Sequence, residues 1–212
     1  MGALSGPLTV SKLFVRGGLP ADFKKTSLDR IRLRTFAPLE PDEDVDERVG
    51  WCVVSSPLDL ELTHEQVFWG SYVNLGLRID RYRLPAALLQ AHFQAACREA
   101  LAKSKREALS KSEKKELMAR VSLKLRRKVL PAMSCFDFSW NLDTMVAYFW
   151  SQSARALDRL GALCEATFGL ELVPNSPYVA ARERHLSEAR LGALDAVVAT
   201  PLHAARKARE AG

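Results

Sequence analysis

The clearest pattern along the chain is an alternation of apolar residues with polar or small ones over positions 67–83. Successive side chains of a β-strand point to opposite faces, so this spacing predicts a strand with one buried face. The residues on the predicted buried face are Val73, Leu75, Leu77 and Ile79.

Two later segments rich in aromatic residues also predict strands. Positions 133–140 alternate, with Phe136, Phe138 and Trp140 on one side. Positions 144–150 are almost wholly apolar, which is typical of a strand covered on both faces. We interpret the aromatic side chains of both segments as core. The alternative is a platform on which single-stranded bases stack, formed by Phe136, Phe138, Trp140, Tyr148, Phe149 and Trp150.

The remaining periodicity predicts strands and helices in mixed order. Short strands are expected over 8–15, 51–54 and 170–173, and helices over 20–34, 85–106, 110–130, 153–168 and from 178 onward. Strands dispersed among helices predict an α+β fold with mainly antiparallel sheet. We expect one α+β region over 1–175, with a projecting pair of basic helices at about 85–130. A helical tail over 176–212 would pack either on its own domain or on a second subunit.

The sequence predicts where the two central helices begin and which of their sides are apolar. Pro85 opens the first, which is expected to turn Leu88, Leu89, Phe93, Ala96 and Cys97 toward the core. Ser110 and Glu113 have the spacing of a capping box at the start of the second. On that second helix one side is apolar, formed by Leu117, Val121 and Leu125, and an adjoining stripe is basic, formed by Arg120, Lys124 and Arg127.

Charge is distributed unevenly. The chain carries a net charge of +6, and positions 98–128 hold twelve Lys and Arg against four Glu, a net of +8. The rest of the chain is therefore slightly acidic, with an acidic segment at 38–47. A concentrated basic segment is what a surface facing a polyanion requires.

Several classes of function lack their sequence signatures. The four cysteines are far apart and form no CxxC pair, and the histidines are isolated, so no metal site is expected. There is no P-loop, no GxGxxG after a strand and no GxSxG, so no cofactor and no enzymatic activity are expected. No secretory signal or membrane span is predicted, which favours a reducing cytoplasm with four free thiols.

The order and spacing of short motifs over roughly residues 10–175 resemble the recombination-associated RdgC family. The motifs are Phe36-Ala37-Pro38-Leu39, Gly50-Trp51, Leu77-Arg78, Leu84-Pro85, the Lys-rich segment 109–117, Leu130-Pro131, the Trp140 strand, the helix start at 151–153 and Leu172-Val173-Pro174. The resemblance implies a homodimer in the nucleoid that binds duplex DNA with little sequence preference, has no catalysis and competes with the RecA recombinase. The family continues well beyond the position that matches Pro174, and the segment 178–212 does not resemble that continuation, so ring closure is left open.

The candidate DNA-binding residues combine the basic segment with Arg78, which matches a family position. They are Arg78, Lys111, Lys114, Lys115, Arg120, Lys124, Arg126, Arg127 and Lys128. Neutralising phosphates releases counterions, so binding would be salt-dependent and nearly blind to sequence. The alternative is a solvated helix face with pairs such as Glu116–Arg120. Arg81 and Arg83 either extend the positive surface or are ordinary edge-strand charges.

Two other classes of function stay open. In one, the basic helices dock an acidic partner protein and DNA is not bound. In the other, Asp137 and Asp143 hold a magnesium ion for nuclease chemistry, although two carboxylates without a supporting cluster are a weak signal.

Overall fold

The computed structural model describes residues 9–43, 45–54, 56–104 and 106–198. The chain divides into two compact units, Met1–Leu172 and Val173–Gly212. The expectations for residues 1–8 and for 199–212 lie outside the described residues.

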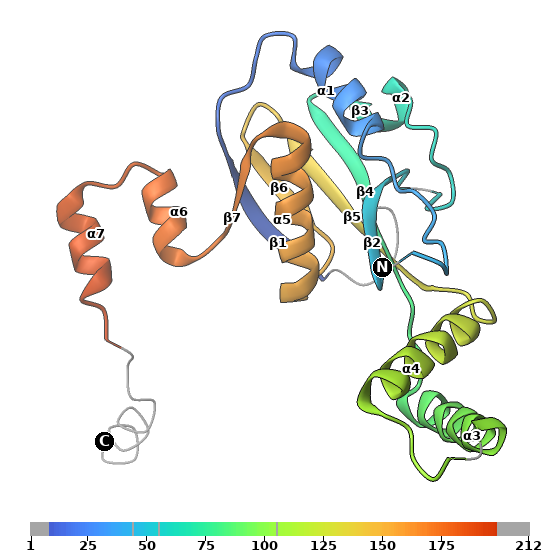
Figure 1. The fold of residues 1–212 in the computed structure, drawn as a ribbon. Coiled ribbons are helices and arrows are strands. Elements are labelled where there is room, and N and C mark those ends of the chain that lie inside the picture. The colour runs from blue at the N-terminus through green and yellow to red at the C-terminus, as the bar shows by residue number, and fades with distance from the viewer. Residues whose placement is uncertain (1–8, 44, 55, 105, 199–212) are drawn as a thin grey trace, which may run out of the picture. The chain divides into compact units, whose positions relative to one another are not determined.

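The first unit is built on one antiparallel β-sheet (Figure 1). The strands run in the order β2-β4-β5-β6-β1-β7, and β3 pairs with β4. Their bounds are β1 Ser11–Arg16, β2 Glu47–Cys52, β3 Phe68–Trp69, β4 Tyr72–Arg81, β5 Ala132–Asn141, β6 Val146–Phe149 and β7 Glu171–Pro174. With the helices that accompany it, this sheet confirms the predicted α+β class with mainly antiparallel pairing.

Helices cover one face of the sheet and form a separate hairpin. In the first unit they are α1 Phe23–Arg32, α2 His64–Val67, α3 Ala86–Ser104, α4 Lys111–Arg126 and α5 Ala154–Phe168. α5 begins at the cap residue Ser153 and ends at Gly169, whose φ of 70° places it in the left-handed region that glycine tolerates. Both ends agree with the sequence-based prediction. Within the described residues, every helix is too short or too polar to span a lipid bilayer.

The core lies between the sheet and helices α1 and α5. Phe23 of α1 meets Trp140 of β5 edge to face, with ring centroids 5.3 Å apart. The indole N–H of Trp51 donates to the hydroxyl of Thr167 in α5 at 2.9 Å, so this buried polar atom is satisfied. Phe138 and Trp140 are buried and Phe136 packs against the same cluster, as predicted for these three.

Two predictions about the faces of strands were wrong. On β4 the second face is also covered, because Asn74 and Asp80 are buried and Gly76 lies between two strands. On β6 the second face is open, because the side chain of Tyr148 is exposed between buried neighbours. Periodicity along one strand shows how its side chains alternate but not which loops cover the sheet.

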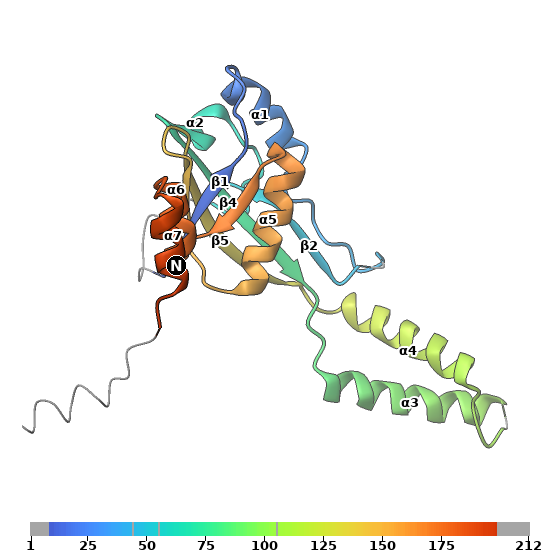
Figure 2. The same ribbon diagram turned by 90° about the vertical axis from the view of Figure 1, so that its left-hand side faces the viewer.

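Helices α3 and α4 form a hairpin inserted between two neighbouring strands (Figure 2). β4 and β5 pair as far as Arg81 and Ala132, and the chain between them leaves the sheet. No residue of α3 is buried, and Leu88 is 41% exposed. The expectation that α3 turns its apolar side to the core was therefore wrong. Its partner is α4, whose Val121 and Leu125 are buried.

The second unit contains α6 Pro177–Glu183 and α7 Glu188–Asp195. Ser176 caps α6 by accepting from the N–H of Val179 at 3.2 Å. Ala181 and Leu191 are buried, and the two helices contact each other. The helical character predicted for this segment is thus present over the described residues.

Gly50 of β2 offers a test of close packing in the first unit. A Cβ added there would lie 2.4 Å from the Cα and 2.6 Å from the N of Phe36, which are backbone atoms. We expect Gly50→Ala to lower the free energy of unfolding by about 1–3 kcal/mol, measured by urea denaturation. The control is Gly161→Ala in α5, where a Cβ meets nothing within 4 Å and helix propensity should raise stability. An unchanged midpoint for Gly50→Ala would contradict this close packing.

Candidate nucleic-acid interface

The hairpin is held at its far end by a capping box. The Ser110 hydroxyl accepts from the N–H of Glu113 at 3.2 Å, and the Glu113 carboxylate accepts from the N–H of Ser110 at 2.8 Å. Arg106, just after α3, donates to the same carboxylate at 3.0 Å. The hydrogen bonds from Ser110 lower the pKa of Glu113. The predicted capping box is confirmed, and it fixes where α4 starts.

Five candidate lysines are exposed and make no side-chain hydrogen bond or ion pair among the described residues. They are Lys111, Lys114, Lys115, Lys124 and Lys128. Arg120 is also exposed, with Glu116 at a distant 4.0 Å. An exposed pair of this kind contributes only tenths of a kcal/mol, so Arg120 remains available to a ligand.

These cations form two groups rather than one stripe. At 3.6 residues per turn, Lys111 and Lys115 share one side of α4, while Arg120 and Lys124 lie on nearly the opposite side. The first group, Lys111, Lys114 and Lys115, surrounds the start of α4 at the free end of the hairpin, and we call it the tip lysines. A single flat surface cannot contact both groups of α4 at once.

The acidic segment neutralises the arginines at the base of α4. Arg126 pairs with Asp46 and donates to the carbonyl of Glu43 at 3.2 Å. Arg127 pairs with Asp42 at 2.8 Å. The Arg126 side chain is only 17% exposed, and its partners join the end of α4 to the loop before β2. These pairs connect residues about eighty positions apart, which sequence spacing does not reveal.

Arg78 lies inside the unit rather than on its surface. Its guanidinium pairs with Asp80 at 2.6 Å, donates to the carbonyl of Pro57 at 3.2 Å and stacks 4.0 Å from the ring of Phe36. The Arg78 side chain is 13% exposed. The structure thus gives this candidate a buried partner and leaves little of its side chain exposed. Arg81 and Arg83, by contrast, make no ion pair among the described residues.

The thiols of Cys52 and Cys135 lie next to each other, close to Arg78 and Gly76. The sulfurs of Cys52 and Cys135 are 3.5 Å apart, and Gly76 lies between their strands. The hydrogen bond to Cys135, together with burial, raises the pKa of Cys52. β2 and β5 are separated by β4, so their backbones are about 9–10 Å apart, beyond the ~7 Å that a disulfide bridges. All four cysteines are free, as predicted.

The carboxylates considered for metal binding differ in environment. Asp137 is buried in β5, and Asp143 is exposed in the connection to β6. Among the described residues, no group of three or more His, Cys, Asp or Glu side chains is arranged to hold a metal ion.

Comparison with known proteins adds no relative from which a role could be transferred. No protein-family model matches the chain, and no curated protein is significantly similar to it. The functional argument therefore rests on the residues and geometry of this chain.

Proposed function

We propose that this protein binds double-stranded DNA without sequence preference, through the tip lysines of the α3–α4 hairpin, and that it catalyses no reaction. Arg120, Lys124 and Lys128 would add phosphate contacts only where DNA backbone also reaches the other side of α4. Arg78 and Arg126 are not part of this proposed interface, because both are engaged inside the first unit.

The observation that carries the proposal is the position of the tip lysines on the helix. Lys111 is the first residue of α4, and Lys114 and Lys115 follow within five residues. The amino end of a helix carries partial positive charge, so a cation in its first turn, such as Lys111 or Lys114, costs about 0.3–1 kcal/mol. No ion pair among the described residues offsets this cost. Folding stability does not explain three lysines at this place, but phosphate binding does.

The resemblance to RdgC proteins supports the biological setting of the proposal. It implies a cytoplasmic, nucleoid-associated homodimer that takes part in recombination by restraining the loading of RecA on DNA. The projecting hairpin suits this role, because it presents its charged end well away from the sheet (Figure 2).

The direct test is fluorescence anisotropy of two labelled duplexes of unrelated sequence, titrated with protein across a salt series. Three to five phosphate contacts predict that log K falls against log salt with a slope of roughly −3 to −5, equally for both duplexes. No binding at low salt, or strong preference for one duplex, would overturn the proposal.

A second function is favoured by one observation. Asp42 and Asp46 of the chain itself already pair with Arg127 and Arg126, so this end of α4 binds carboxylates. An acidic partner protein could replace them there without any DNA binding. Size-exclusion chromatography with and without duplex separates the two functions, because only the first predicts co-elution with DNA.

A further inference from the structure

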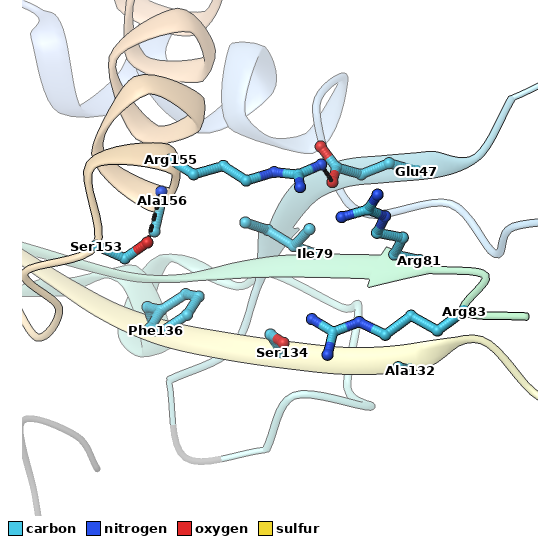
Figure 3. A pocket seen from close by; sticks show the side chains of 10 residues that line it. All are labelled: Glu47, Ile79, Arg81, Arg83, Ala132, Ser134, Phe136, Ser153, Arg155 and Ala156. Carbon is cyan, nitrogen blue, oxygen red and sulfur yellow. Dashed lines mark hydrogen bonds and ion pairs between the residues drawn. The ribbon is translucent and has the colours of Figure 1, made fainter. Parts of the chain in front are cut away.

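A pocket lies on the α5 side of the sheet, where β4 ends and β5 begins (Figure 3). It is lined by residues of β2, β4, β5 and the first turn of α5, and its volume is about 130 Å³. One water molecule occupies about 30 Å³ in the liquid, so the pocket has room for a phosphate group.

Arginines dominate the charge of the pocket. Arg81 and Arg83 enter it from the end of β4, and Arg155 reaches in from α5 (Figure 3). Arg81 and Arg83 have no ion pair or side-chain hydrogen bond among the described residues. Like charges gathered in this way repel one another, and neither side chain makes a hydrogen bond or ion pair within the described residues that would offset this repulsion. Their placement therefore needs an explanation other than stability.

One carboxylate, that of Glu47, lies in the pocket and is held by arginines. Glu47 accepts from Arg155 and, at 2.7 Å, from Arg159. Its side chain is only 13% exposed. Of the described residues that line the pocket, it alone is acidic, so two arginines remain without a counter-charge.

The polar atoms around the pocket also suit an anion. The hydroxyls of Ser134 and Ser153 line it, and α5, a helix of fifteen residues, starts beside it. Guanidinium groups present paired N–H donors that match two oxygens of a phosphate. The positive end of α5 adds to the same preference.

We propose that this pocket is a phosphate-binding site in which Arg81 and Arg83 are the principal ligands and Glu47 is a built-in competitor for Arg155. The phosphate belongs either to a DNA backbone or to a small phosphorylated molecule. The site is distinct from the tip lysines, so the proposal goes beyond the proposed function and does not depend on it.

The first experiment is calorimetric titration of the full chain with pyrophosphate, against chloride at equal ionic strength. We expect saturable binding in the native protein and at least a tenfold weaker affinity in Arg81→Gln/Arg83→Gln. Neither side chain has a partner to lose, so the variant should keep its unfolding temperature. The matched control is Lys111→Gln/Lys114→Gln, which should bind pyrophosphate as the native protein does. Equal weakening in both variants, or none in the pocket variant, would overturn the proposal.

Glu47→Gln is expected to tighten pyrophosphate binding, and a misfolded protein would not show tighter binding. Removing the competing carboxylate frees Arg155, so pyrophosphate should bind several-fold more tightly. Weaker binding would contradict the competitor role.

A duplex titration of the same pocket variant then identifies the source of the phosphate. Loss of duplex affinity along with pyrophosphate affinity indicates DNA, whereas unchanged duplex affinity indicates a small phosphorylated molecule. Failure of the tip-lysine variant to affect duplex binding would instead count against the proposed function alone.

Discussion

Replacing the tip lysines Lys111, Lys114 and Lys115 together by Gln is expected to weaken duplex binding by roughly 10²–10³-fold at about 0.1 M salt. Each phosphate contact contributes about 0.9 to the steepness with which log K falls against log salt. Three contacts therefore strengthen binding by about 10²–10³-fold when the salt concentration falls tenfold from about 1 M, and the variant loses this gain. The slope should become shallower by about three, and the loss should be equal for unrelated sequences. Anisotropy titrations across a salt series measure both quantities.

The design separates binding from folding. Removing cations from the amino end of α4 relieves an unfavourable interaction with the helix dipole, so the triple variant should unfold at the same or a higher temperature. The matched control is Lys25→Gln/Arg30→Gln/Arg34→Gln, which removes the same charge from exposed positions on and just after α1. If the control variant loses as much affinity as the tip variant, general charge and not the hairpin tip determines binding.

The sequence predicted the elements well and their partners less well. The capping box at Ser110 and the end of α5 at Gly169 are local features, set by a hydroxyl, a carboxylate and a left-handed backbone, and they are where we expected them. The apolar side of α3 is equally visible in the sequence. A helical pattern, however, predicts an apolar face without showing what it packs against. The partner of α3 is α4 and not the core, and no residue of α3 is buried.

The candidate site shows the same division. The charge of the hairpin is plain in the sequence, but the exposed lysines could not be told from the engaged arginines. Arg126 and Arg127 are held by acidic residues about eighty positions away, and the strand position of Arg78 gave no sign that loops cover that face. Arg81 and Arg83, ranked below Arg78 from the sequence, prove to be the unpaired members of the group. Long-range pairing of charges follows from the topology and not from spacing along the chain.

The second large expected effect is on stability and concerns the buried ion pair of Arg78 and Asp80. Asp80→Ala is expected to lower the free energy of unfolding by about 3–5 kcal/mol, because it leaves a guanidinium in the interior without its counter-charge. The carboxylate of Asp80 is 4% exposed and accepts two hydrogen bonds from Arg78, at 2.6 and 2.9 Å. A loss of this size is a large share of the stability of an ordinary domain, about 5–15 kcal/mol. Urea denaturation, followed by tryptophan fluorescence, measures it.

Two further variants establish whether burial is the cause. Asp42→Ala breaks the ion pair between Asp42 and Arg127, whose side chains are 63% and 59% exposed. It should lower the free energy of unfolding by no more than about 1 kcal/mol, because solvent screens that pair. Arg78→Met/Asp80→Leu removes both buried charges and should recover most of the stability that Asp80→Ala loses, since no unpaired ion remains in the interior. If the double variant is as unstable as Asp80→Ala, the contacts of Arg78 with Phe36 and Pro57 hold the loops to the sheet by packing, and the unpaired charge is not what destabilises the fold.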